Sequence, residues 1–214
     1  LAICKQDIEK VFSKVNFALA GRKKMDELIA IMTHAQLVKP EHDTLYIDAI
    51  NAFNCISRKK AFETALKICP QMATLIHALY GSTTKIWARK DGFNSWAYVE
   101  GKTGSVQGCV LGPLIHGLST FDAYTAVDKE FRHHSDMFMG AYMDDVALRG
   151  TSHVVVNAFN IFKDQTEAIG SKINFAKGKT EVLLGRYENL EELQNSIASY
   201  VATGIPLENI KIHP

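Results

Sequence analysis

The sequence predicts an α+β fold in which an antiparallel sheet carries helices packed on one face. Three observations lead to this prediction. Apolar runs of strand length are bounded by turn residues, longer segments repeat apolar residues at helical spacing, and short hairpin connections alternate with helical crossovers. The chain has 214 residues, 47% of them hydrophobic, so it can bury a core as one large domain, with or without a small lobe.

Helices are expected where apolar residues recur three or four positions apart and a start or stop residue bounds the repeat. Pro40 closes the first helical region, and Pro70 separates the second helix from the third. Pro113 suits the first turn of the fourth helix, and Gly170 ends the fifth. The apolar side of the first helix consists of Leu28, Ile29, Ile31 and Met32. The expected helices cover residues 25–37, 58–67, 71–80, 113–133, 154–169 and 190–201.

Strands are expected in short apolar runs bounded by turn signals. The first of them ends on a carboxylate, Asp48, and the second and third are joined around Asp91 and Gly92 as a hairpin. A glycine-rich loop over residues 101–112 follows, and two later strands flank the turn at residues 143–145. The expected strands cover residues 44–48, 85–89, 95–99, 137–142, 146–149 and 181–184.

Composition and charge exclude some classes of protein. The formal net charge is +1, so bulk charge does not indicate a polyanionic partner. No apolar run reaches the roughly 20 residues that span a bilayer, so no membrane partner is expected. We expect reduced thiols in an intracellular protein, because the cysteines lack the spacing of a zinc site. These cysteines are Cys4, Cys55, Cys69 and Cys109. The sequence does not indicate an oligomeric state.

Three aspartates are candidates for chemistry. Asp48 ends a strand, whereas Asp144 and Asp145 occupy a tight turn between two apolar strands. Adjacent carboxylates repel each other, and a divalent cation relieves that cost. Two Mg²⁺ ions about 3.5–4 Å apart, held by carboxylates, are the machinery of nucleotidyl transfer. Asp48 and Asp144 can share such ions only if their strands are neighbours in the sheet. Taken alone, the acidic pair is equally well explained as a solvated turn.

Four segments, in order, resemble the palm motifs of reverse transcriptases from non-LTR retrotransposons. They are residues 48–54 (DAINAFN), 104–113 (with GSVQG and LGP), 141–145 (AYMDD) and 170–174 (GSKIN). Upstream, residues 16–22 (NFALAGR) resemble the fingers segment that precedes the first motif. Each motif alone is common, but four in this order are specific. The resemblance spans roughly residues 10–185.

The resemblance implies a right-hand polymerase palm that copies an RNA template onto a DNA primer with dNTPs. Asp48 and Asp144 would hold two Mg²⁺ ions with help from Asp145, and Mn²⁺ could substitute for Mg²⁺. One ion would lower the pKa of the primer 3′-hydroxyl, and the other would neutralise the triphosphate and the leaving pyrophosphate. The task of the protein would then be placement and charge neutralisation.

Other residues would bind the incoming nucleotide by the same resemblance. Phe53 would be a steric gate that rejects a ribose 2′-hydroxyl, which points to DNA synthesis. Its ordinary alternative is core packing. Gln107 and Gly108 lie in a loop whose backbone can approach a ligand closely, although the same loop is also explained as flexible surface. Tyr142, in the catalytic box, is expected to touch the nucleotide as well.

Basic residues at two places are also candidates. Lys177 and Lys179 compete for the basic position of the fourth motif, since spacing from Asn174 favours the first and the following Thr-Glu-Val-Leu context favours the second. Arg22 and Lys23 are expected to touch nucleic-acid phosphates, but a solvated helix start explains these two cations equally well. Met143 is also expected to touch the nucleic acid.

Residues 1–40 are expected to form part of the helical fingers, residues 41–185 the palm, and residues 186–214 a C-terminal helical extension. We expect a piece of a longer polypeptide, because the basic fingers signature, the primer grip and the thumb do not appear. Such a palm is expected to fold but to polymerise poorly in isolation. By family, its action is expected in the nucleus.

Two alternatives remain open at the level of sequence. A group II intron or retron type of reverse transcriptase would share these motifs, although residues 51–54 (NAFN) favour the retrotransposon branch. A catalytically incompetent remnant that binds nucleic acid or protein is the other alternative. The presence of Asp48, Asp144 and Asp145 argues against it.

Overall fold

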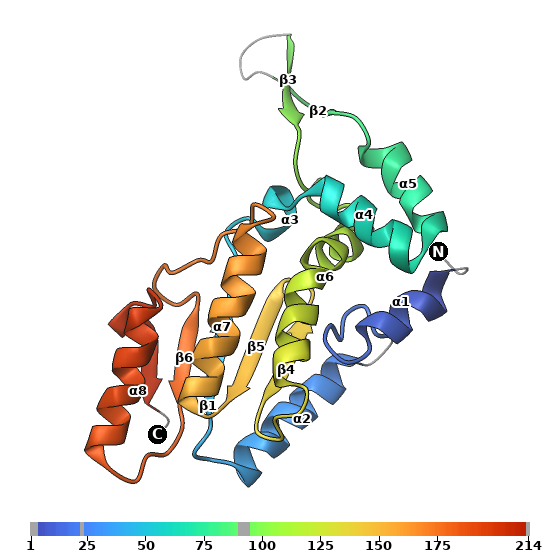
Figure 1. Cartoon of the computed structure of the whole chain (residues 1–214). Helices are drawn as coiled ribbons and strands as arrows, with labels where there is room; N and C mark the ends of the chain where they lie inside the picture. The colour runs from blue at the N-terminus through green and yellow to red at the C-terminus, as the bar shows by residue number, and fades with distance from the viewer. Residues whose placement is uncertain (1–3, 22–23, 90–94, 213–214) are drawn as a thin grey trace.

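The computed structural model describes residues 4–21, 24–89 and 95–212 (Figure 1). In this part of the chain the strands are β1 (Asp43–Ile47), β2 (Thr84–Arg89), β3 (Trp96–Gly101), β4 (Phe138–Tyr142), β5 (Asp145–Gly150), β6 (Glu181–Leu184) and β7 (Ile210–Ile212). The α-helices are α1 (Lys5–Phe12), α2 (Lys24–Val38), α3 (Ala52–Cys55), α4 (Arg58–Ile68), α5 (Pro70–Tyr80), α6 (Gly112–Phe131), α7 (Ser152–Glu167) and α8 (Leu190–Ala202).

The mixed α+β fold is confirmed. The described residues form one five-stranded sheet in the order β4–β5–β1–β6–β7 and a separate two-stranded ribbon of β2 and β3. All neighbouring strands in the sheet are antiparallel except β6 and β7, which are parallel. Parallel neighbours need a crossover connection, and α8 with a short 3-10 helix (Leu207–Asn209) supplies it. The prediction of a wholly antiparallel sheet, with a purely helical segment after residue 185, was therefore wrong at this edge.

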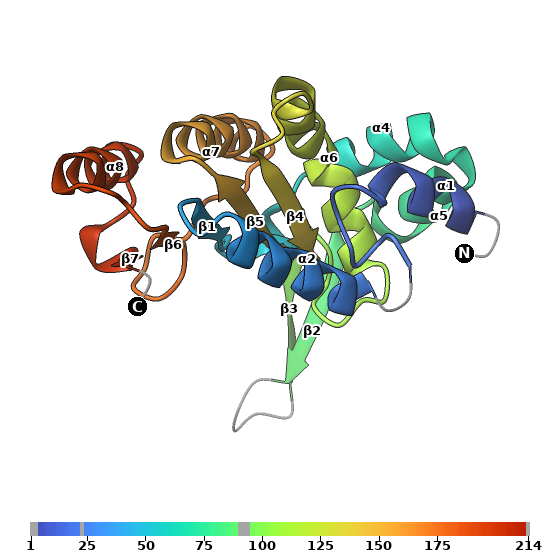
Figure 2. The same cartoon turned by 90° about the horizontal axis from the view of Figure 1, so that it is seen from below.

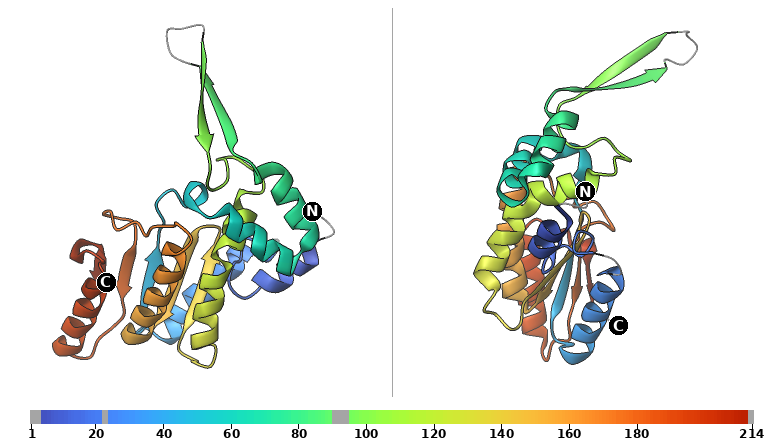
Figure 3. Two further views of the ribbon diagram at one scale, coloured as in Figure 1. Left: turned by 45° about the horizontal axis from the view of Figure 1, so that its top comes forward. Right: turned by 90° about the vertical axis from the view of Figure 1, so that its right-hand side faces the viewer.

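Helices lie on both faces of the sheet, not on one face as expected. Helices α6 and α7 cover one face with α8 beside α7, whereas α2 lies across the opposite face (Figure 2; Figure 3, right). No residue of α2 is buried, so its expected apolar side is only partly covered. No helix of the described residues is long and apolar enough to cross a membrane.

A buried arginine explains how α2 stays on the sheet. Arg149 of β5 donates to the carbonyl oxygens of Ala35 (3.3 Å) and Lys39 (2.6 Å) at the end of α2. Its other terminal nitrogen donates to Thr44 Oγ1 (2.6 Å) and to the carbonyl oxygen of His42 (3.1 Å). A cation at a helix C-terminus satisfies carbonyls that have no partner within the helix. The sequence pattern, which concerns apolar spacing, does not reveal this polar anchor.

The cysteine prediction was wrong for one pair. Cys4 and Cys69 form a disulfide across 65 positions of sequence, whereas Cys55 and Cys109 are free. The fold brings the pair together because Cys4 caps the start of α1 and Cys69 lies between α4 and α5, with 6.1 Å between the two Cα atoms. Spacing along the chain gives no signal for a pair this far apart.

A buried carboxylate joins β1 to the C-terminal segment. Asp43 accepts hydrogen bonds from the Gly185 backbone amide (2.8 Å), the Tyr187 hydroxyl (2.8 and 2.9 Å) and the Tyr200 hydroxyl (2.9 Å). Burial raises the pKa of Asp43, and these donors oppose the rise. Residues after 185 are thus packed into the fold through a polar cluster as well as through β7.

Asp43→Ala should lower the free energy of unfolding by at least about 2 kcal/mol, because several buried donors lose their acceptor at once. Urea denaturation measures this. Asp43→Asn, which keeps one acceptor oxygen, should lose less. Asp7→Ala, at an exposed position of α1, should stay within about 0.5 kcal/mol of the starting protein. If Asp43→Ala lowered the free energy of unfolding as little as Asp7→Ala does, the polar cluster around Asp43 would not stabilise the fold as proposed.

Candidate active site

The pairing of β1 with β5 brings the predicted carboxylates to one end of the sheet. Ile47 lies opposite Val146, so Asp48 leaves β1 beside the turn that contains Asp144 and Asp145. That turn closes the β4–β5 hairpin, and Met143 within it has a left-handed φ of 59°. The condition for Asp48 and Asp144 to share ions, that their strands are neighbours in the sheet, is therefore met.

The turn carboxylates lie in a partly desolvated and mutually repulsive setting. Burial raises the pKa of Asp144, and the charge of Asp48 raises it further. Burial also raises the pKa of Asp145, as do the charges of Asp144 and Asp48, whereas Lys179 lowers it. Asp145 therefore senses the charges of both other acids, and Asp144 senses the charge of Asp48. A bound cation would relieve this repulsion.

Residues 174–180, which precede β6, hold Asp48 in place through hydrogen bonds. The Asn174 side-chain amide donates to Asp48 Oδ2 over 2.8 Å, and the Asn174 backbone amide donates to the Asp48 carbonyl oxygen over 2.8 Å. The Asp48 backbone amide donates to Thr180 Oγ1 over 3.2 Å. Lys179 Nζ lies 3.7 Å from Asp48 Oδ1. The candidate site residues did not include Asn174 and Thr180, although both belong to the segment that resembles the fourth motif.

The turn of Asp144 and Asp145 has a second support, which sequence reasoning also missed. Asn16 is fully buried, and its side-chain amide donates to the Met143 carbonyl oxygen over 3.1 Å. The backbone on either side of Asn16 pairs with Ala141 through two hydrogen bonds of 2.8 Å. Tyr124 of α6 is buried beneath the turn, where burial and the charge of Asp144 raise its pKa. These contacts fix the backbone that presents the carboxylates.

Phe53 lies on α3, immediately after the Asp48 strand, and is half-buried. Its ring lies 5.4 Å from the ring of His116 on α6. Burial lowers the pKa of His116 to about 4, so this imidazole is neutral near pH 7. The Ser105 backbone amide donates to the Phe53 carbonyl oxygen over 2.7 Å, which joins the glycine-rich loop to α3. Phe53 is therefore held by neighbours on two sides.

The other candidates are less closely tied to the carboxylates. Gln107 and Gly108 are exposed on the glycine-rich loop, and Lys177 is exposed on the turn before β6. Lys179, unlike Lys177, has a carboxylate of the site within ion-pair distance. Arg22 and Lys23, as well as the hairpin turn at Asp91 and Gly92, lie outside the described residues.

Two grooves flank the turn of Asp144 and Asp145. One, of about 580 Å³, lies between α2 and the sheet and includes Asp48, Tyr142, Asp145 and Lys179 in its lining. The other, of about 570 Å³, lies on the opposite side of Tyr142 and Met143, toward the start of α6. Tyr142 borders both grooves, so a ligand in either one would lie against the turn.

The carboxylates of the site fit Mg²⁺ that is bound jointly by the protein and a substrate, and they do not form a complete coordination shell by themselves. In residues 4–21, 24–89 and 95–212, no three acidic, histidine or cysteine side chains are gathered closely enough to hold a metal ion by themselves. Mg²⁺ commonly takes one or two carboxylates and completes its shell with water and substrate phosphates. The carboxylates of Asp144 and Asp145, whose pKa values are raised by burial and by neighbouring charges, suit that mode of binding together with Asp48.

The chain belongs to the reverse transcriptase (RNA-dependent DNA polymerase) family, which residues 2–200 match. It is 28% identical over 179 residues to the retrotransposable element SLACS 132 kDa protein of Trypanosoma brucei gambiense. That match covers 82% of this chain and 14% of the relative, so the chain corresponds to a small part of that protein.

Solved telomerase structures share the fold. Telomerase from Candida albicans, in complex with the TWJ fragment of telomeric RNA, superposes with a TM-score of 0.67 at 11% identity, covering 87% of this chain and 35% of that one. Apo telomerase from Candida tropicalis, truncated from its C-terminal domain, gives a TM-score of 0.65 at 11% identity, covering 88% and 40%. At this identity the likeness concerns the fold alone.

Two glycines of the loop allow a matched test. A Cβ on Gly104, where φ is +60°, would lie 2.3 Å from backbone atoms of Phe53 and Asn54, whereas a Cβ on Gly108, where φ is +85°, meets nothing within 4 Å. Gly108→Ala should cost only the left-handed backbone strain of about 1–2 kcal/mol. Gly104→Ala should cost at least about 1 kcal/mol more, because the loop must move off α3. Urea denaturation compares the two, and equal losses would show that the loop does not pack tightly on α3.

Proposed function

We propose that this chain is the catalytic palm of an RNA-directed DNA polymerase of the non-LTR retrotransposon type. One observation carries the proposal: Asp48, hydrogen-bonded to Asn174 and Thr180, directly follows β1, the strand that pairs with β5 beside the turn of Asp144 and Asp145. Family membership and the SLACS relative support the same reading.

Asp48 and Asp144 are the proposed ligands of two Mg²⁺ ions, with Asp145 assisting and Mn²⁺ able to substitute. When bound, such ions activate the primer 3′-hydroxyl and neutralise the triphosphate and its leaving group. The residues of the chain supply placement. Asn174 orients one oxygen of Asp48, and Asn16 fixes the turn backbone at Met143. Lys179 adds a positive charge beside Asp48, where it would also attract the phosphates of a substrate.

The remaining assignments concern the substrate. Phe53, held against His116, is the proposed steric gate that selects dNTPs, since an apolar ring leaves a ribose 2′-hydroxyl without a partner. Gln107, Gly108 and Tyr142 are proposed to line the nucleotide site. Lys179 fills the basic position of the fourth motif better than Lys177, because it approaches Asp48.

The proposed partners are an RNA template, a DNA primer and dNTPs. We assign residues 1–40 to the fingers, residues 41–185 to the palm and residues 186–214 to an extension that joins the palm sheet through β7. The proposed place of action is the nucleus. Segments in a longer polypeptide would supply further grip on primer and template, as is expected for a chain that spans 14% of its relative.

Asp144→Asn should reduce Mg²⁺-dependent dNTP incorporation on a primed RNA template by at least about a hundredfold, because metal-held charge stabilises the transition state by several kcal/mol. Asp164→Asn, at an exposed position of α7, is the matched control and should keep full activity. Circular dichroism checks that both variants fold. Full activity in Asp144→Asn would refute the metal-site assignment, and binding of RNA without extension by the unchanged protein would favour a non-catalytic remnant.

A further inference from the structure

The β2–β3 ribbon projects from the body of the molecule (Figures 1 and 3). Its register places Lys85 opposite Glu100, Trp87 opposite Tyr98, and Arg89 opposite Trp96. Because side chains alternate along a strand, these six share one face, and the other face carries small and aliphatic residues. The second face consists of Thr84, Ile86, Ala88, Ala97, Val99 and Gly101. The two faces of the ribbon therefore differ in chemistry.

The aromatic rings of the first face are open to solvent. Trp87 is 56% exposed, Trp96 66% and Tyr98 45%. Trp87 and Tyr98 lie 5.0 Å apart, and Lys85 Nζ lies 4.7 Å from the centre of the Tyr98 ring. A two-stranded ribbon is marginally stable alone, and clustered exposed apolar rings usually mark a binding surface. Rings interleaved with cations suit the stacked bases and phosphates of a single strand, whereas the centre of a protein interface is depleted of charge.

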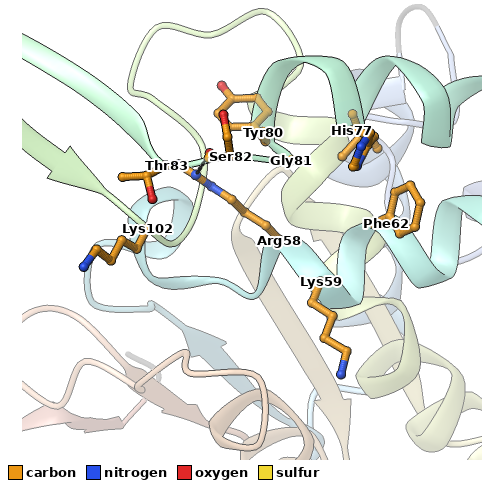
Figure 4. Close-up of a pocket in the computed structure, with 10 residues that line it drawn as sticks. Arg58, Lys59, Phe62, His77, Tyr80, Gly81, Ser82, Thr83 and Lys102 are labelled. Atoms are coloured by element: carbon orange, nitrogen blue, oxygen red, sulfur yellow. Dashed lines mark hydrogen bonds between the residues drawn. The ribbon is translucent and has the colours of Figure 1, made fainter.

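A basic pocket of about 460 Å³ lies at the foot of the ribbon (Figure 4). Arg58 is fixed at its base: Nε donates to the Gly104 carbonyl oxygen over 2.6 Å, and the guanidinium lies over the Tyr80 ring at 4.9 Å. The side chains of Lys59 and Lys102 are 86% and 72% exposed, and their ammonium groups point away from Arg58 (Figure 4). Their ion pairs, at 3.9 and 3.6 Å, are weak enough to yield to phosphates.

The foot of the ribbon is tied to the catalytic end of the sheet. The Gly104 backbone amide donates to the Ile56 carbonyl oxygen over 2.8 Å, and Thr103 Oγ1 donates to the Asn54 carbonyl oxygen over 2.9 Å. Both acceptors belong to α3 or to the residue that follows it, a few positions after Asp48. A strand bound on the ribbon is therefore held in a fixed relation to the carboxylates.

We propose that the aromatic face of the ribbon and the basic pocket at its foot form an accessory surface for single-stranded RNA. The bases stack on Trp87, Tyr98 and Trp96, and the phosphates lie against Lys85, Lys59 and Lys102. The choice of RNA over other strands rests on the proposed function, in which the template is RNA. The surface would hold that template where it leads toward the active site.

Fluorescence anisotropy with a short, unstructured, fluorescein-labelled RNA tests the proposal on the full chain in buffer without divalent metal. The double variant Trp87→Ala/Tyr98→Ala should bind at least about tenfold more weakly, since each stacked base is worth about 1–3 kcal/mol. The matched control on the opposite face, Ile86→Ala/Val99→Ala, should bind within about twofold of the starting protein. Trp87→Phe/Tyr98→Phe keeps the rings and should also retain binding.

The basic pocket is tested separately by salt dependence. Lys59→Gln/Lys102→Gln should weaken binding and reduce the slope of log affinity against log salt by about one for each phosphate that the variant no longer neutralises. Three results would each overturn the proposal. The first is an equal loss of affinity from variants on the two ribbon faces, and the second is tighter binding of DNA of the same sequence. The third is a changed oligomeric state in Ile86→Ala/Val99→Ala while the ring variants leave RNA binding unchanged.

Failure of this proposal can be told apart from failure of the proposed function. Asp144→Asn should bind the RNA like the starting protein, because the assay contains no divalent metal. Loss of extension with normal RNA binding in that variant supports the metal site alone. Normal extension by the Trp87→Ala/Tyr98→Ala variant with unchanged RNA affinity would show that the ribbon does not bind RNA, and it would not affect the metal-site assignment.

Discussion

The antiparallel register of β1 and β5 is the constraint on which the candidate site depends. Ile47 opposite Val146 puts Asp48 at the same end of the sheet as the turn of Asp144 and Asp145. A slip of one residue would turn the side chains of β1 to the other face and separate the carboxylates. Register is set by burial on the α6–α7 side, where Leu45, Ile47, Val146 and Leu148 are in the core.

Contacts from three separate segments hold the carboxylates in that arrangement. Asn174 and Thr180 hold Asp48 from the segment before β6, and Asn16 holds the turn from a segment more than a hundred positions away in sequence. Gly104 lets the glycine-rich loop lie directly on α3, next to Phe53. Burial, and after it the charges of neighbouring carboxylates, raises the pKa values of Asp144 and Asp145, and the packing and hydrogen bonds around these residues sustain that setting.

Local patterns in the sequence predicted most elements, and the resemblance to reverse transcriptases implied that Asp48 lies near the acidic turn. Strand β6 has the predicted bounds, and β1 and β5 are within one residue of theirs. What the sequence did not reveal is long-range: the disulfide of Cys4 and Cys69, the anchoring of α2 by Arg149, and the parallel addition of β7. Each depends on pairing between segments that are distant in the sequence, and apolar periodicity predicts only local structure. Asn174 and Thr180 were visible in the fourth motif, but their role needed the geometry.

The central claim is that Asp48 and Asp144 serve one shared metal site. Mn²⁺ binding, measured by electron paramagnetic resonance on the starting protein, Asp48→Asn, Asp144→Asn and the double variant, tests it most directly. If the two carboxylates share an ion, each single variant loses most of the affinity and the double variant loses little more. Additive losses, or single variants that bind Mn²⁺ as tightly as the starting protein, would contradict the shared site.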